Sequence, residues 1–153
     1  MPIPGTATLR VLMVDDDADL LRTMSLYLES MDNVSVSTVP SPIMALRKLM
    51  SEHYDVCVSD FNMPGMNGIS FLDAIRRDGN PIPFLMVTGS GTDRLESQAF
   101  AAGVERVIRK NREGDLFFRE LVDAVRTAAE GSGQTSTGIP ACSKTCIRSP
   151  ISP

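Results

Sequence analysis

Cysteine is scarce in this sequence, and its few copies do not form a paired set. There are three cysteines among 153 residues. Cys57 lies in an apolar run, where we expect a small buried side chain, and Cys142 and Cys146 lie near the C-terminus. These two thiols alone do not complete the tetrahedral shell of a structural zinc site. An odd number of cysteines without a disulfide framework is typical of a reducing compartment, and we expect a cytoplasmic protein.

Long apolar segments and an excess of positive charge are also lacking. No apolar run approaches the roughly 20 residues that are needed to cross a bilayer. Residues 1–8 lack the basic and apolar segments of a signal peptide. The net charge is −4 and the isoelectric point is near 4.9, which excludes the basic surface typical of nucleic-acid-binding proteins. We therefore expect neither membrane insertion nor direct contact with nucleic acid.

The composition is otherwise that of one ordinary globular domain. Hydrophobic residues make up 42% and charged residues 22% of the chain, near the averages of globular proteins, and we expect one domain over residues 8–130. From Gly131 onward the chain is rich in Ser, Thr, Gly and Pro. Such a segment buries too little apolar surface to offset the entropy of ordering it. We therefore predict an unstructured tail or linker over residues 131–153.

Short apolar runs alternate with helical patterns through the domain. The runs that predict buried β-strands cover residues 9–14, 34–37, 55–59, 83–88 and 105–109. The helical stripes lie within residues 20–31, 43–50, 69–75, 95–102 and 116–125. Five strands that alternate with five helices indicate an α/β fold with a parallel sheet covered on both faces. We predict a flavodoxin-like three-layer (βα)5 sandwich with strand order 2-1-3-4-5.

Local signals mark the ends of two helices. Ser41 and Pro42 predict the start of the second helix, because proline suits the first turn of a helix. The apolar stripe of this helix is expected to consist of Ile43, Leu46, Leu49 and Met50. Gly103 is a plausible C-cap for the fourth helix, because glycine readily adopts the left-handed conformation required there.

Polar residues follow the strands at the points where they end. Asp15 and Asp16 follow the first strand, Asp60 the third, Thr88 ends the fourth and Lys110 follows the fifth. In open α/β sheets, ligands bind beyond the carboxyl ends of the strands, at the point where the strand order reverses. The first and third strands flank that point in the predicted order. We therefore expect three carboxylates to converge there.

The chemistry of such a cluster depends on what compensates its charge. Neighbouring carboxylates repel one another unless a cation or a proton is present, and oxygen ligands with room for water suit Mg²⁺. Together with Lys110 and the Thr88 hydroxyl, a cation would stabilise negative charge on a phosphoryl group. Asp60, at the centre, can then act as the nucleophile that forms an acyl phosphate.

Each of these residues also has an ordinary structural interpretation. Asp17 is best explained as the N-cap of the first helix, since aspartate is favoured there. Thr88 alone would be a common strand-end residue, and Lys110 alone a solvated lysine. His53 is interpreted as a surface loop residue rather than a phosphoryl relay. The joint placement at four strand ends is what favours a functional site.

The motifs around these residues resemble a known family. They are VDDD at residues 14–17, SDFNMPGMNG at 59–68, VTG at 87–89 and the lysine at position 110. Together they resemble the receiver (CheY-like) domain of two-component response regulators, over roughly residues 8–129. The resemblance implies that Asp60 accepts a phosphoryl group from a phosphohistidine on a sensor histidine kinase. The domain would then be a switch rather than an enzyme with its own substrate.

The resemblance also implies a Mg²⁺ site. Asp16 would bind the ion directly and Asp15 mainly through water. Asp60 and the main-chain carbonyl of Asn62 would supply the other protein ligands.

The remaining positions concern the switch. By resemblance, Thr88 is the hydroxyl that moves to the phosphoryl group, Lys110 pairs with the phosphate, and Gly89 leaves access to the site. Two positions depart from the family. Val107 replaces the frequent aromatic switch residue, and Asn111 replaces the proline that usually follows the lysine in a cis peptide. A cis bond before a non-proline residue costs about 3–4 kcal/mol, so either a trans bond or local strain is expected there.

The downstream partner of the domain and two alternative functions stay open from the sequence. A downstream protein or a fused output domain is expected on the face formed by the fourth helix, the fifth strand and the fifth helix, and a homodimer is a further option. A haloacid-dehalogenase-type phosphatase would use Asp15 and Asp17 as a D-x-D motif, but would leave Asp60 unexplained. A degenerate receiver that is never phosphorylated is the other alternative.

Overall fold

Five strands and five helices alternate along the chain in the computed structural model, which describes residues 7–89, 92–110 and 115–137. The strands are β1 (Leu9–Val14), β2 (Val34–Val39), β3 (Val56–Asp60), β4 (Phe84–Thr88) and β5 (Arg106–Arg109). The helices are α1 (Ala18–Glu29), α2 (Pro42–Ser51), α3 (Gly68–Arg77), α4 (Asp93–Ala102) and α5 (Leu116–Thr137). All strand pairs are parallel, in the order β2-β1-β3-β4-β5. The predicted flavodoxin-like fold is confirmed.

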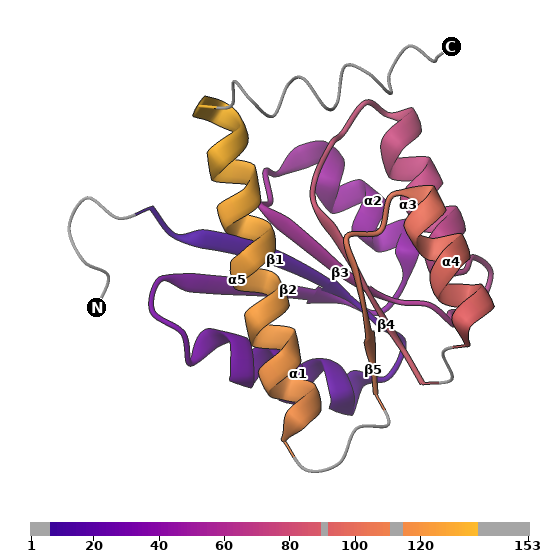
Figure 1. Cartoon of the computed structure of the whole chain (residues 1–153), viewed down its shortest axis with the longest axis horizontal. Helices are drawn as coiled ribbons and strands as arrows, with labels where there is room; N and C mark the ends of the chain where they lie inside the picture. Colours follow the sequence, from indigo (N-terminus) through magenta and orange to yellow (C-terminus); the bar gives the residue numbers. More distant parts are fainter. Residues whose placement is uncertain (1–6, 90–91, 111–114, 138–153) are drawn as a thin grey trace.

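The sheet separates two layers of helices and two halves of the core. In Figure 1, α1 and α5 cover one face of the sheet, and α2, α3 and α4 lie on the other. Val11 and Met13 of β1 pack with the side chains of α1 and α5, whereas Leu12 and Val14 pack with those of α2, α3 and α4. This alternation follows from the strand geometry, in which successive side chains point to opposite faces.

Side-chain caps fix the starts of four helices. Each cap accepts a hydrogen bond from a backbone N–H in the first turn, and the caps are Asp17, Ser41, Asn67 and Thr92. The predicted cap role of Asp17 and the predicted start of α2 at Ser41 and Pro42 are both confirmed. Gly103 ends α4 with a φ of 111°, in the left-handed region that glycine tolerates.

The buried face of α2 matches the predicted stripe only in part, because Leu46 and Leu49 pack against the core but Ile43 and Met50 do not. Ile43 and Met50 are 52% and 78% exposed, whereas Ala45 is fully buried. Ala45 and Leu49, one turn apart, face the core. Ile43 and Met50 lie well over a quarter turn from Ala45 around the helix, so both point outward.

Helix α5 continues beyond the boundary that the composition predicted. It ends at Thr137, whereas residues from Gly131 onward were expected to be unstructured. Extending an existing helix fixes one residue for each hydrogen bond gained, so a poor helix-forming sequence can still follow a well-packed helix. The rest of the predicted tail, including Cys142 and Cys146, lies outside the described residues.

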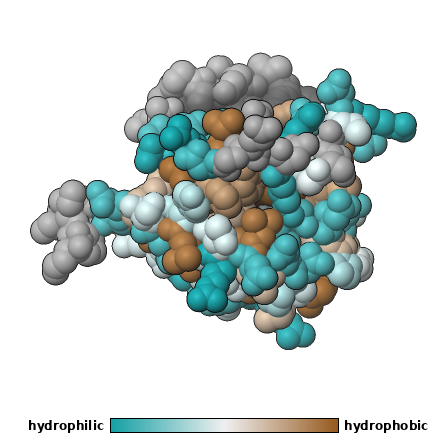
Figure 2. Space-filling view, turned by 90° about the horizontal axis from the view of Figure 1, so that it is seen from below, coloured by the Kyte–Doolittle hydropathy of each residue, from teal (hydrophilic) through white to brown (hydrophobic). Residues whose placement is uncertain are grey.

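The surface carries scattered apolar side chains. Figure 2 shows brown apolar residues that are mostly set apart by teal polar ones. The exposed large hydrophobic residues include Leu26, Met50, Phe100 and Leu116, and single residues of this kind are usual on a soluble fold. Over the described ranges, no helix combines the length and the apolar character needed to cross a membrane.

Candidate functional site

Three carboxylates meet at the carboxyl edge of the sheet. β1 and β3 are neighbours, with Val14 opposite Ser59, so that the residues after both strands lie side by side. One carboxylate oxygen from each of Asp15, Asp16 and Asp60 lies within 4.8 Å of the other two. Asp15 is 1% and Asp60 6% exposed, whereas Asp16 faces solvent. The predicted convergence of these carboxylates is confirmed.

Lys110 joins the two buried carboxylates. Its Nζ lies 3.1 Å from Asp15 Oδ2 and 3.0 Å from Asp60 Oδ1. The backbone N–H of Lys110 donates to the carbonyl of Thr88 at 2.8 Å, which places the lysine directly after β5 and beside the end of β4. One ammonium group therefore serves two carboxylates that are 45 residues apart in the chain.

Burial governs the protonation of these groups. It raises the pKa of Asp60, and the hydrogen bond from Lys110 opposes this rise only in part. Burial likewise raises the pKa of Asp15, although the N–H of Asp17 donates to its Oδ1 at 2.9 Å. Burial works against the charge of Lys110, but its bond to Asp60 and the two nearby carboxylates raise its pKa overall.

The charge of the cluster suits one divalent cation. With Asp15, Asp16 and Asp60 ionised, Lys110 neutralises one of three negative charges. Two negative charges then remain, on oxygen atoms, which are the ligands that Mg²⁺ and Ca²⁺ take in proteins. The residues present therefore fit a divalent metal ion, with Asp16 open to solvent for entry of a hydrated ion.

The backbone around Asp60 is held from several sides. Ser59 Oγ donates to the carbonyl of Asp60 at 2.9 Å, and Phe61 N donates to the carbonyl of Val87 at 2.9 Å. The loop that follows closes where Gly68 N donates to the carbonyl of Phe61 at 2.8 Å. The carbonyl of Asp60 and the N–H of Phe61, which form the peptide group directly after the strand, are thus both hydrogen-bonded.

The other predicted site residues lie close to this cluster. Thr88 is fully buried at the end of β4, beside β3. Among the described residues other than its neighbours in the chain, no heavy atom lies within 4 Å of the position that a Cβ on Gly89 would take, so this glycine leaves open space beside the site. Asn62 lies exposed in the loop after Asp60. The specific roles assigned to these three residues stay predictions.

The two departures from the family pattern lie on and beyond β5. Val107 is partly buried and packs against the core half that contains α2, α3 and α4. Asn111 lies outside the described residues, and so does the geometry of its peptide bond with Lys110.

Two features of the site were missed by the sequence reasoning. Arg109 Nε on β5 donates to Glu96 Oε2 of α4 at 2.8 Å, and this arginine also lies 3.9 Å from a carboxylate oxygen of Asp93. The other feature is the tight packing of Gly68 against the backbone of Asp60. A glycine directly after the Asn67 cap was visible in the sequence, but nothing local pairs Arg109 with Glu96 across 13 residues.

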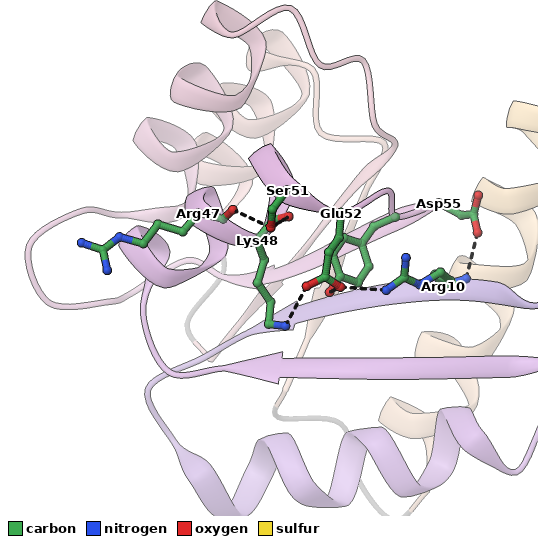
Figure 3. A network of polar contacts seen from close by, with 7 residues as sticks. Arg10, Arg47, Lys48, Ser51, Glu52 and Asp55 are labelled. Carbon is green, nitrogen blue, oxygen red and sulfur yellow. Dashed lines mark hydrogen bonds and ion pairs between the residues drawn. The ribbon is translucent and has the colours of Figure 1, made fainter.

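A second polar cluster lies at the opposite, amino edge of the sheet (Figure 3). Glu52 accepts hydrogen bonds from Arg10 at 2.8 Å, Tyr54 at 3.0 Å and Lys48 at 3.3 Å. The guanidinium carbon of Arg10 also lies 4.7 Å from the centre of the Tyr54 ring. We call this group the basal cluster.

A hollow of about 670 Å³ lies beside the basal cluster and away from the three aspartates. Its lining includes Tyr54, Asp55, Pro83 and Glu105. His53 also borders it, in a loop, with Nε2 3.1 Å from Asp55 Oδ1. The ring of His53 is well exposed, so its interpretation as a surface loop residue is confirmed. The aspartate cluster is thus a surface-edge site and does not line this hollow.

Asp17 does not join the aspartate cluster. Its Oδ1 accepts from Leu20 N at 3.1 Å, which directs this carboxylate to the start of α1. The pair that a D-x-D phosphatase motif would require, Asp15 with Asp17, therefore has one member occupied in helix capping.

Comparison with known proteins decides the family. The family model described as the response regulator receiver domain matches residues 11–125. The chain belongs to the response regulator receiver domain family. The receiver fold and the role of a response regulator receiver domain, both expected from the sequence, are confirmed.

The curated relatives are longer proteins. The chain is 38% identical over 129 residues to protein-glutamate methylesterase/protein-glutamine glutaminase 2 of Rhodospirillum rubrum, a match that covers 79% of this chain and 35% of the relative. It is 31% identical over 127 residues to the transcriptional regulatory protein ResD of Bacillus subtilis, with coverages of 83% and 50%. The chain therefore spans between about a third and a half of the length of these two relatives.

Solved receiver domains share the fold. The Francisella response regulator 1452 receiver domain superposes with a TM-score of 0.74 at 21% identity, covering 82% of this chain and 99% of that one. The chemotaxis response regulator CheY4 of Vibrio cholerae superposes with a TM-score of 0.69 at 26% identity, with coverages of 78% and 99%. Both cover nearly the whole solved chain, so this receiver domain carries the full fold.

Proposed function

We propose that this receiver domain accepts a phosphoryl group on Asp60. The observation that carries the proposal is the position of its buried carboxylate, 3.0 Å from Lys110 Nζ and within reach of the Asp15 and Asp16 oxygens. An Asp60 oxygen attacks the phosphorus atom of a phosphohistidine on a sensor histidine kinase. The new P–O bond forms as the P–N bond breaks, and the electron pair of that bond leaves with the imidazole.

The chain's own residues prepare Asp60 for this attack. Lys110 holds one Asp60 oxygen and supplies positive charge where the equatorial phosphoryl oxygens gather charge. Asp16 and Asp60, with the main-chain carbonyl of Asn62, would hold Mg²⁺, and Asp15 would act mainly through water. The bound ion would supply further compensation for the phosphoryl charge. Gly89 leaves the approach to the carboxylate open.

The conformational response is assigned to Thr88 and to the face made by α4, β5 and α5. Thr88 ends β4 opposite Arg109, the residue that pairs with Glu96 on α4. A shift of Thr88 toward a phosphoryl group would therefore act on the β5 backbone and, through Arg109, on α4. Because Val107 is aliphatic, this ion pair replaces the usual aromatic side chain as the contact that links the site to α4.

A protein partner is proposed for this face. Phe100 on α4 and Leu116 at the start of α5 are 50% and 51% exposed. They offer apolar contacts to a downstream protein, to a fused output domain or to a second copy of the domain. The relatives named for methylesterase activity are about three times as long as the matched segment. For the receiver domain itself, we propose the role of a cytoplasmic phosphoacceptor switch.

The test uses a small phosphodonor. Wild-type protein is incubated with acetyl phosphate and Mg²⁺, and intact-protein mass spectrometry measures the gain of one phosphoryl group that hydroxylamine removes. We expect the gain in wild type and its absence in Asp60→Ala. The proposal fails if wild type gains no phosphoryl group, or if Asp60→Ala gains it equally, and the first result would favour a degenerate receiver.

A further inference from the structure

Helix α3 begins in direct contact with the backbone of Asp60. Gly68 is the first residue of this helix. A Cβ placed on Gly68 would lie 2.9 Å from the carbonyl oxygen of Asp60 and 3.1 Å from Cα of Phe61. Real Cβ atoms essentially never approach another heavy atom to less than 3.0 Å. No side chain fits at this position unless the backbone moves.

The atoms around Gly68 differ in how easily they can yield. The third neighbour is Cε of Met86, at 3.0 Å, which is the end of a flexible side chain and can rotate away. The carbonyl of Asp60 cannot, because Ser59 Oγ donates to it and the next N–H, of Phe61, is bonded to β4. An added methyl group would therefore displace the Asp60–Phe61 peptide or the start of α3.

Such a displacement reaches the reacting group. The Asp60 carboxylate stands 3.0 Å from Lys110 Nζ, and its distance to the Asp15 and Asp16 oxygens is at most 4.8 Å. We propose that Gly68 is a positioning residue for the phosphoacceptor. Its lack of a side chain lets α3 pack against the Asp60–Phe61 backbone, and this contact sets the direction of the Asp60 carboxylate. The inference rests on the proposed function of Asp60.

The opposite effect would be expected from helix propensity alone. Alanine forms helices better than glycine, so Gly68→Ala would stabilise α3 if local preference decided the outcome. A loss of function in this variant would therefore come from the atoms that the added methyl group meets and not from helix propensity. Gly131 gives a matched control, because in the described part of the chain no heavy atom outside its own stretch of helix lies within 4 Å of its Cβ position.

The experiment compares Gly68→Ala with Gly131→Ala in the full chain. Initial rates of phosphorylation by acetyl phosphate are measured at saturating donor and Mg²⁺, together with Mg²⁺ affinity by calorimetry and folding by circular dichroism. A displacement of about half an ångström is expected to slow phosphorylation about tenfold per folded molecule, because a shift of about 1 Å can cost about 100-fold. Gly131→Ala is expected to react at the wild-type rate.

Two further variants identify the atom responsible. Met86→Leu removes the terminal methyl group, and adding it to Gly68→Ala is expected to leave the rate low, because the Asp60 carbonyl remains in the way. Ser59→Ala releases that carbonyl on its other side. It is expected to restore part of the rate in Gly68→Ala and, by itself, to slow phosphorylation slightly, so it tests the same restraint if Gly68→Ala does not fold.

The outcomes separate this inference from the proposed function. If wild type is not phosphorylated, the proposed function fails and the inference with it. If wild type is phosphorylated and a folded Gly68→Ala matches its rate and Mg²⁺ affinity, only the positioning role is overturned. Full restoration by Met86→Leu would overturn it too, since the obstacle would then be a core side chain. The positioning role would also be overturned if Gly68→Ala did not fold and Ser59→Ala were phosphorylated at the wild-type rate.

Discussion

The two edges of the sheet hold carboxylates in opposite circumstances. At the carboxyl edge, Asp15 and Asp60 are buried and share one ammonium group, and burial raises the pKa of both. At the amino edge, Glu52 in the basal cluster is in contact with water. Hydrogen bonds from Tyr54 and Arg10 lower its pKa.

The difference shows how the surroundings of a carboxylate decide its use. A carboxylate with three donors and access to water is already stabilised, so it adds a little to folding and has less to gain from a further cation. Carboxylates that are buried and share one ammonium group are unfavourable in the metal-free protein, and they gain most when a cation or a phosphoryl group arrives. The four predictions that follow test this contrast between the two edges.

The largest effect is expected when the lysine at the carboxyl edge is removed, and removal of a lysine at the amino edge serves as the control. Lys110→Ala is expected to slow phosphorylation of Asp60 by acetyl phosphate about 100-fold, as is typical for loss of one preorganised group that stabilises transition-state charge. Lys48→Ala removes a lysine from the basal cluster and is expected to react at the wild-type rate. Time-resolved intact-protein mass spectrometry measures both. Equal rates in the two variants would contradict the contrast.

Magnesium should stabilise the protein only through the carboxyl edge. A ligand that binds the folded state alone adds about 2.7 kcal/mol to the free energy of unfolding at one hundred times its Kd. We expect Mg²⁺ to raise the melting temperature of wild type and of Glu52→Gln by the same amount, and that of Asp16→Asn by much less. Thermal denaturation in EDTA and in excess Mg²⁺ measures these shifts. A full shift in Asp16→Asn would remove that residue from the site.

Neutralising Asp60 should stabilise the metal-free protein. Because the folded state raises the pKa of this carboxyl above 3.8, the folded state holds more protons than the unfolded state just above that pH. The free energy of unfolding therefore falls as pH rises through the raised pKa. At pH 7 in EDTA, Asp60→Asn is expected to be more stable than wild type, and its fall in stability as the pH rises should be shallower. Urea denaturation at several pH values checks this, and lower stability of Asp60→Asn at pH 7 would contradict it.

The smallest effect is expected at the basal cluster. The pKa of Glu52 is lowered by its hydrogen bonds, so its contribution to stability is present above its usual pKa and is lost as pH falls. Because the side chain is well exposed, we expect Glu52→Gln to lower the free energy of unfolding at pH 7 only slightly. The sign is the opposite of that for Asp60→Asn. Urea denaturation of both variants in the same buffer measures the difference, and a gain in stability for Glu52→Gln would break the comparison.

Most of the fold could be predicted from the sequence, because its signals are local. The apolar runs give the strands, and the polar residues that end them give the carboxyl edge. The sequence could predict that Asp60 and Lys110 lie close together, because the carboxyl ends of parallel strands lie at one edge of the sheet. The role of Asp17 as a helix cap could be predicted because it depends only on the residues of the helix that it begins.

What was missed depends on distances between separate elements. The Arg109–Glu96 pair needs the position of α4 beside β5, and no periodicity contains it. The exposure of the Ile43 side chain depends on which side of α2 packs against the sheet. The extension of α5 to Thr137 follows from a helix already packed on the sheet, whereas composition describes each segment as if it stood alone.

The alternation of β1 side chains between two halves of the core has a consequence for how this domain can change over evolution. Of the two helix layers, Val11 and Met13 pack with α1 and α5, whereas Leu12 and Val14 pack with α2, α3 and α4. Substitutions that refit one layer of helices to a new partner need not be matched by substitutions in the other. One sheet can thus keep its aspartates in place while the two outer layers diversify separately.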